Sequence, residues 1–417
     1  WLKTFGSATR FPESMKWAVL AICCTVQVSC DGTCLGGFPE LDVQADDAGF
    51  SVRISPKHGQ GLDSVWLANW LKEHTQWLKN VFFKYGAVIF RGFSIPDALA
   101  FEQVALALLR DLERVYLGTS PRSSINGTTY VHTAADFDPH RTVPVHLEMS
   151  FRSKPPATQM FFANKVDQWK GGETPLTDFR GVWEQLRENP EWQLKFGNGK
   201  VKYIRNMDDC SAVGHFDPLV QKCWQKMFKD EKDVMQKCAD EDFNCTWGAS
   251  NKLTLSNVQP FVRKHPITGD EVWFNHINVL HKDSMAADYA RTSHLWGGLV
   301  QVWPLALSFY YRALFGLLDF FVPEKELGST AVFENGEVFS KKELSEMKAA
   351  IHANTIQHAY AAHDVVLVDN LRVGHGREIY LGGKGSRQIF TAWSNEYPQS
   401  WQQDAVLDTQ DATLGDV

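Results

Sequence analysis

Two histidines and one glutamate have the residue types and spacing of a metal site. His146 and Glu148 stand two residues apart in VPVHLEMSF, where the residues alternate as in a β-strand. Side chains at i and i+2 of a strand point to the same face, so the imidazole and the carboxylate would project together. His375 follows a second strand-like run, VVLVDNLRVGHGR. Two histidines and one carboxylate are the ligands of non-haem Fe(II) oxygenases, which leave the other metal positions open.

A His-x-Glu pair alone is a weak signal, because such triplets arise by chance and a strand histidine is usually structural. Two further residues strengthen it. Arg387 lies on the strand-like run after His375, and a guanidinium can clamp a dicarboxylate in bidentate fashion. Thr174, in GGETPLTD, would donate its hydroxyl to the same carboxylate. Together these residues predict a metal with an open side and a nearby anion site.

The elements that must position these residues are predicted by periodicity and by turn residues. Residues 62–84 have helical spacing of Leu, Trp and Phe, and YGAVIFRGF after them indicates a buried strand. Residues 343–356 predict another helix, and HDVVLVDNLRVGHGR and SRQIFTAWS predict two late strands. Thr177 or Asp178 is expected to cap a helix that begins near Gly181. We therefore expect a fold that is mainly β with helical additions.

Several motifs in order along the chain make a family resemblance clear. They are GAVIFRGF, GTSPRSSINGTTY, PVHLEMSF, GGETPLTD, VKYIRN, HPITGDEVWFN and VDNLRVGHGR, and they span roughly residues 50–396. The chain resembles the taurine dioxygenase (TauD/TfdA) family of Fe(II)/2-oxoglutarate-dependent dioxygenases. Within that family it is most similar to the branch of the syringomycin-biosynthesis aspartate hydroxylase.

The resemblance implies a double-stranded β-helix (jelly-roll, cupin-like) core and an iron bound by His146, Glu148 and His375. It makes Arg387, assisted by Thr174, the partner of 2-oxoglutarate, with O2 as the other cosubstrate. The implied reaction hydroxylates a C–H bond of a small polar or acidic metabolite, such as an amino acid or a carrier-tethered amino acid, and releases succinate and CO2. Two departures stand out: many relatives have Asp in place of Glu148, and the segment GGKGSR before Arg387 is slightly long.

Four more residues are candidates for the substrate side of the site. Asn206 and Asn275 lie in motifs shared with the family, where a structural role is equally compatible with the sequence. Arg377 lies two residues after His375, so it would bind an acidic substrate or pair with Asp369. The sequence likewise leaves the role of Arg122, in SPRS, undecided.

Two rival functions remain at this point. One is a jelly-roll protein that has lost turnover and serves as a binding or interaction module, which the intact ligand set and Arg387 argue against. The other is a Zn(II) hydrolase at the same ligands, which would give Arg387 and Thr174 no role. Decarboxylation of 2-oxoglutarate and metal preference would separate these rivals from a dioxygenase.

The composition restricts the class of binding partner that we expect. The net charge is −7 and no Lys/Arg-rich run occurs, which disfavours nucleic-acid binding and leaves a small molecule as the expected partner. The eight cysteines form two groups without paired CxxC spacing, so free buried thiols are the simpler interpretation and disulfides the alternative. The oligomeric state stays open.

One long apolar run, residues 295–322, is long enough to span a bilayer but is interrupted by Gln301, Pro304, Arg312 and Asp319. We expect a buried or partner-facing helical insertion at about 285–325, with membrane contact not favoured.

The domain expected is 46–400, between a signal-like or disordered leader at 1–45 and a tail at 401–417. Localisation would be cytoplasmic by default, and secretory or organellar if Met15–Cys30 is a signal peptide.

Overall fold

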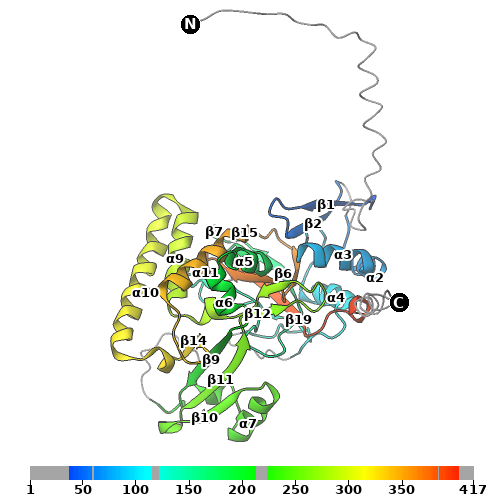
Figure 1. The fold of residues 1–417 in the computed structure, drawn as a ribbon. Coiled ribbons are helices and arrows are strands. Elements are labelled where there is room, and N and C mark those ends of the chain that lie inside the picture. The colour runs from blue at the N-terminus through cyan, green and yellow to red at the C-terminus, as the bar shows by residue number, and fades with distance from the viewer. Residues whose placement is uncertain (1–36, 59–60, 115–121, 213–222, 384, 403–417) are drawn as a thin grey trace, which may run out of the picture.

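The computed structural model describes residues 37–58, 61–114, 122–212, 223–383 and 385–402. Helices and strands occupy comparable lengths of this part of the chain, so the fold is mixed rather than mainly β (Figure 1). The helical share is larger than the sequence predicted because helices cover the flanks of the sheets, including a long pair, α9 and α10, at one edge of the molecule (Figure 1).

The largest sheet has seven strands in the order β1-β2-β3-β16-β6-β19-β4, and only the pairing of β2 with β3 is parallel. Its strands are β1 (Leu41–Ala45), β2 (Ser51–Pro56), β3 (Ala87–Phe90), β16 (Val365–Asp369), β6 (Thr158–Val166), β19 (Arg387–Ser394) and β4 (His132–Thr133). β3 and β16 are buried along their whole length, as their unbroken apolar sequences require. The predicted strand in YGAVIFRGF and the two late strands are therefore confirmed.

A four-stranded antiparallel sheet, in the order β15-β8-β17-β5, carries four of the nine predicted site residues: His146, Thr174, His375 and Arg377. Its strands are β15 (Thr355–His358), β8 (Thr174–Asp178), β17 (Val373–Arg377) and β5 (Val143–His146). β5 ends at His146, so the prediction of one strand through Glu148 was wrong. The chain turns there instead, and Met149 has a positive φ of 52°.

The remaining strands form a second four-stranded sheet and two short pairs. The sheet consists of β10 (Asn244–Trp247), β11 (Leu253–Pro260), β9 (Lys200–Met207) and β14 (Ser329–Phe333). The pairs are β12 (Val262–Lys264) with β13 (Glu271–Trp273), and β18 (Tyr380–Leu381) with β7 (Lys170–Gly171).

Two disulfides lie beside the second four-stranded sheet. They join Cys210 to Cys223 and Cys238 to Cys245. The expectation of free thiols was wrong for these four cysteines, because the backbone brings residues 13 and 7 positions apart to Cα–Cα distances of 5.1 and 6.2 Å. The other four cysteines, at positions 23, 24, 30 and 34, lie outside the described residues.

The helices pack around these sheets. They are α2 (Ser64–Glu73), α3 (Thr75–Tyr85), α4 (Ala98–Leu108), α5 (Phe179–Leu186), α6 (Pro190–Phe196), α7 (Glu231–Asp240), α8 (Ile277–Leu280), α9 (Asp283–Trp296), α10 (Val302–Phe321) and α11 (Lys341–Ala353). The predicted helix at 62–84 is two helices that break at His74. Asp178 caps α5 by accepting from the Arg180 amide, which confirms one of the two caps predicted.

The ends of the described chain pack more closely than the sequence suggested. β1 lies inside the segment predicted as a leader, yet it pairs along its full length with β2. Trp401, at the start of the predicted tail, is buried and donates its indole N–H to the Thr75 carbonyl. The apolar run at 295–322 forms α10 and the end of α9, and none of the described helices is both long and apolar enough to cross a membrane.

Candidate metal centre and cosubstrate cavity

His146, Glu148 and His375 form a compact buried cluster. One ligand atom from each lies within 4.8 Å of the others. Glu148 Oε2 is 3.9 Å from His146 Nε2 and 3.6 Å from His375 Nε2. Two imidazole nitrogens and one carboxylate oxygen that converge in this way could hold a divalent metal.

The backbone positions the two histidines opposite each other. His375 on β17 is the cross-strand partner of His146 on β5, and their ring centroids are 4.6 Å apart. His146 Nδ1 lies 2.8 Å from the Pro144 carbonyl, which can only accept, so Nδ1 carries the proton. Nε2 of His146 is therefore left with its lone pair toward the cluster, as a metal ligand requires.

Asn370 holds the third residue in place. Its side-chain oxygen accepts from the Glu148 amide at 2.6 Å, and its amide nitrogen donates to the Glu148 carbonyl at 3.0 Å and to the Pro156 carbonyl at 2.7 Å. Asn370 is fully buried at the end of β16. Because Glu148 lies beyond its strand, this two-sided clamp replaces the strand register in fixing its backbone.

Electrostatics keep the cluster ready for a cation. Burial alone would raise the pKa of Glu148, but the positive charge of Arg122 and the two neighbouring imidazoles hold that pKa well below its usual range. Burial lowers the pKa of His375 to about 4. Near neutral pH the cluster therefore offers an ionised carboxylate and a neutral His375, the forms that bind metal.

Arg387 and Thr174 meet at the starts of β19 and β8, which belong to different sheets, as the sequence predicted for an anion site. Arg387 Nη2 donates to Thr174 Oγ1 at 3.3 Å, and its Nε donates to the Gly172 carbonyl at 2.8 Å. Gly172 has a φ of +79°, and a Cβ there would come within 2.9 Å of Arg387 Cδ. Only glycine therefore allows this approach. The buried guanidinium lies between the rings of Tyr360 and Tyr380, 5.8 and 5.9 Å from their centroids.

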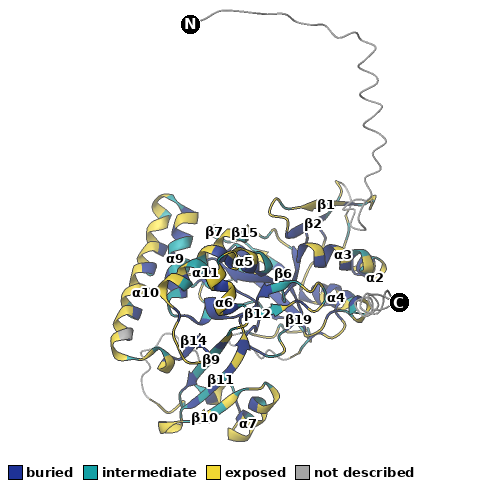
Figure 2. Cartoon of the chain, in the orientation of Figure 1, coloured by how far each residue is buried: buried dark blue, intermediate teal, exposed yellow. Residues whose placement is uncertain are grey.

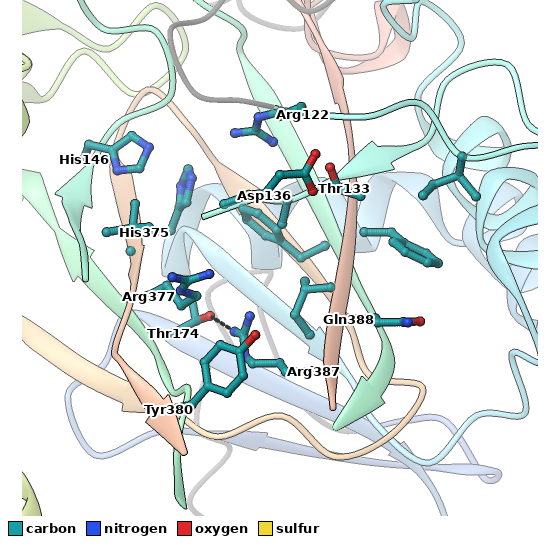
Figure 3. A pocket seen from close by; sticks show the side chains of 18 residues that line it. Arg122, Thr133, Asp136, His146, Thr174, His375, Arg377, Tyr380, Arg387 and Gln388 are labelled. Carbon is teal, nitrogen blue, oxygen red and sulfur yellow. Dashed lines mark hydrogen bonds between the residues drawn. The ribbon is translucent and has the colours of Figure 1, made fainter. Parts of the chain in front are cut away.

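One cavity of about 350 Å³ joins these two groups of residues. It is within the size range of small-molecule sites. Figure 3 shows the two histidines along one side, Arg387, Thr174 and Tyr380 at one end, and Arg122 and Asp136 toward the other end. The arrangement can hold a metal and a short dicarboxylate side by side.

Three of the four substrate-side candidates have structural partners, and two of these lie away from the cavity. Asn206 donates to the carbonyls of residues 325 and 327, and Asn275 donates to that of residue 261. Arg377 lines the cavity, but it donates to the carbonyls of residues 137, 138 and 141 and does not pair with Asp369. Asp369 instead contacts His265 and Tyr397.

Arg122 is the fourth candidate, and it reaches the metal cluster itself. Its Nη2 lies 2.6 Å from Glu148 Oε2, and its side chain is buried over the ring of Trp393. Arg122 therefore stands at the junction of the metal cluster and the outer part of the cavity.

Sequence reasoning missed Asn370 and Asp136. Asn370 stands in the quoted motif VDNLRVGHGR, where a buried amide between a strand and a histidine is a usable signal. Asp136 accepts a hydrogen bond from Ser123 and lines the cavity, but nothing in its local sequence marks it out.

The family model described as taurine catabolism dioxygenase TauD, TfdA family matches residues 51–393. The chain belongs to this family. It is an Fe(II)- and 2-oxoglutarate-dependent dioxygenase, and the buried His-Glu-His cluster fits the ion that this chemistry needs.

Individual relatives agree with the family. The dapdiamide synthesis protein DdaC of Enterobacter agglomerans is 27% identical over 306 residues, which cover 72% of this chain and 80% of DdaC. A clavaminate synthase-like protein of Arabidopsis thaliana is 26% identical over 213 residues, 49% of this chain and 62% of that protein. The solved structure of PvcB from Pseudomonas aeruginosa is similar with a TM-score of 0.46 and 14% identity, covering 86% of this chain and 93% of PvcB.

Proposed function

We propose that this dioxygenase hydroxylates a C–H bond of a small metabolite that carries both an acidic and a basic group, such as an amino acid or a carrier-tethered amino acid. His146, Glu148 and His375 would hold the iron, and Arg387 with Thr174 would hold 2-oxoglutarate. The observation that carries the proposal is the shared cavity, which is lined by both histidines of the three-residue cluster and by the Arg387 guanidinium.

The residues divide the work in the proposed mechanism. Bound Fe(II) supplies the oxidising chemistry with 2-oxoglutarate and O2, which yields succinate and CO2. Arg387 offers a fork of N–H donors to a carboxylate, and its half-buried position strengthens that contact. The apolar wall of Phe161, Ile389 and Phe390 limits water around the reacting groups.

The substrate class follows from the outer part of the cavity. Arg122 offers a cation for a substrate carboxylate, and Asp136 offers an anion for an ammonium group (Figure 3). Opposite charges at one end of a cavity of this size favour a small zwitterion over a purely acidic ligand. The relative DdaC is named for dapdiamide synthesis, which is compatible with an amino-acid-like substrate.

The core is proposed to be a jelly roll. The seven-stranded sheet and the sheet β15-β8-β17-β5, which carries the metal ligands, would be its two faces. The catalytic domain would comprise about residues 41–401, from β1 to Trp401, with the apolar helical segment 285–325 as an insertion.

The test is succinate release from 2-oxoglutarate by the full chain with Fe(II) and a panel of amino acids. We expect release that one class of zwitterion stimulates and that Asp136→Asn reduces through a higher KM for that substrate. Gln388→Glu, at another residue of the cavity wall, is the matched control for a changed charge. Absence of succinate with iron bound would favour the inactive binding protein, and stimulation by simple dicarboxylic acids alone would contradict the zwitterion.

A further inference from the structure

The outer face of α10 is an exposed apolar surface with no partner among the described residues. The inner face of the helix packs on α9: Tyr311 stacks on Tyr289 at 5.5 Å, and Ser308 donates to the Ala286 carbonyl. The outer face follows the edge of the molecule and is mostly exposed (Figure 2). Its large exposed side chains are Val302, Trp303, Leu305, Phe309, Tyr310, Leu317, Phe320 and Phe321.

This surface is as large as a stable protein interface requires. Its five aromatic side chains are 51% to 83% exposed. At roughly 200 Å² each, they alone leave about 600 Å² of surface open. The aliphatic residues bring the face close to the ~800 Å² that each partner buries in a standard interface. A typical monomer has no exposed apolar patch larger than ~300–600 Å².

The spacing along this face is that of a helix which pairs with another helix. The exposed residues Val302, Ala306, Phe309, Ala313, Gly316 and Phe320 are separated alternately by four and three positions. Apolar residues in that alternation form the seam of a two-helix packing. Any one-sided apolar helix face has the same alternation, so the choice of a helix as the partner rests on the sizes of the seam residues.

The sizes of the seam residues match a second copy of the same helix run antiparallel. If the two-fold axis passes at the level of residue 311, Phe309 faces Ala313 of the other copy and Ala306 faces Gly316. Val302 then faces Phe320. Large residues meet small ones at the layers next to the axis, and two small residues meet in the next layer, which is the self-complementarity of a two-fold interface.

We propose that α10 is a homodimerisation surface on which a second copy of this chain packs its own α10 antiparallel. Arg312 is the exposed charged side chain described on this helix, and it is not one of the six seam residues. It lines a hollow of its own protomer that holds the basic Lys282, Lys341 and Lys348 as well as the acidic Asp283 and Glu324.

The first test is sedimentation equilibrium of the full chain over a range of concentrations. We expect a dimer whose dissociation constant rises by about 100-fold or more in Phe309→Glu, because each copy would bury a charge in the seam. Leu194→Glu, at an 88% exposed leucine on α6, is the matched control and should leave the dimer intact. A parent protein that is monomeric at all concentrations would overturn the proposal.

Cross-linking tests the antiparallel register. With a rise of 1.5 Å per residue, two copies of residue 310 would lie within about 3 Å along the helix axes, and two copies of residue 303 about 24 Å apart. A short bis-maleimide should therefore link Tyr310→Cys to itself beyond the background of the parent, but not Trp303→Cys. Equal linking of both variants would indicate parallel packing and contradict the register.

A last variant separates a close-packed helix pair from a lipid surface. A Cβ at Gly316 would meet nothing within 4 Å in the protomer, so Gly316→Phe should fold normally. It adds apolar surface but overfills the layer shared with Ala306. We expect weaker dimerisation, by about tenfold. A monomeric protein that binds phosphatidylcholine vesicles, and binds them more tightly as Gly316→Phe, would overturn the proposal in favour of a membrane contact.

Discussion

The metal side of the cavity and its outer end are built in different ways. His146, Glu148 and His375 are 8%, 2% and 5% exposed and are held by paired strands and by the Asn370 clamp. Asp136, at the outer end, is exposed and follows the two-residue strand β4. The difference teaches that the proposed metal ligands are fixed by buried, paired backbone, whereas the proposed substrate contact Asp136 lies on a less constrained segment that can change without disturbing them.

Removal of a metal ligand should have the largest effect. Glu148→Ala leaves two imidazoles and the Arg122 guanidinium at the cluster, so a cation faces a positive neighbour instead of a carboxylate. We expect iron affinity and turnover to fall by more than the 10–100-fold that is typical of residues behind the ligands. Iron binding measured by competition with a chelator would check this, and retention of tight binding would contradict the assigned ligand.

Loss of the guanidinium should come next. Arg387→Met removes a charge-assisted contact worth about 1.5–3 kcal/mol in total, so the KM for 2-oxoglutarate should rise by about 10-fold to 150-fold. Iron affinity should stay within a few-fold of the parent, because Arg387 does not touch the metal ligands. A changed iron affinity with an unchanged KM would reverse the assigned roles of the two groups.

Replacement of Asn370 should weaken iron binding more than replacement of a comparable buried asparagine outside the cavity. Asn370→Ala frees the backbone of Glu148, and we expect iron affinity to fall by about 10–100-fold, with partial rescue of activity at high iron. Asn206→Ala is the matched control, since Asn206 is also buried and donates to two backbone carbonyls but lies outside the cavity. Both variants should be less stable than the parent, but only Asn370→Ala should lose iron affinity. Equal losses of iron affinity in the two variants would show that Asn370 has no particular role in holding Glu148.

The smallest expected effect is the pH dependence of stability that arises from two buried histidines. Burial lowers the pKa of His375 to about 4 and that of His358, on β15, to about 3. The unfolded chain takes up these protons near pH 6.5. At these two histidines, the free energy of unfolding of the metal-free protein should therefore be independent of pH above that value. It should fall as the pH drops toward 4. The lowered pKa of each histidine would reduce the free energy of unfolding by up to about 2 kcal/mol between pH 7 and pH 5.

Urea unfolding at both pH values, with His358→Gln as the comparison, measures this effect. A smaller pH dependence in His358→Gln is the expected result. An unchanged pH dependence would mean that His358 takes up its proton equally well in the folded state.

The metal cluster was predictable from sequence because the chemistry restricts residue types and the strand pattern restricts their direction. His146 and Arg387 lie at the ends of strands that the apolar pattern predicted, and His375 lies within β17, in the predicted run HDVVLVDNLRVGHGR. Thr174 begins β8, a strand that the pattern did not predict. Asp136 was not predictable, because its place in the cavity depends on how a loop crosses two distant strands. The end of β5 at His146 was also missed, since the alternating pattern continues through Met149 while the backbone turns.

The helices α9 and α10 show the same limit of prediction from sequence. The run at 295–322 predicted a helix, and α10 confirms it, but which face is buried depends on α9. Tyr289 and Ala286 hold the inner face. Only the packed structure shows that the seam from Val302 to Phe320 stays exposed.

The most direct test is a crystal structure of the full chain prepared anaerobically with Fe(II) and 2-oxoglutarate, with data collected at the iron absorption edge. We predict one anomalous peak within bonding distance of His146 Nε2, His375 Nε2 and a Glu148 oxygen, with the far carboxylate of 2-oxoglutarate on Arg387 and Thr174. An iron peak at other residues, or 2-oxoglutarate bound away from Arg387, would contradict the proposed division of the cavity.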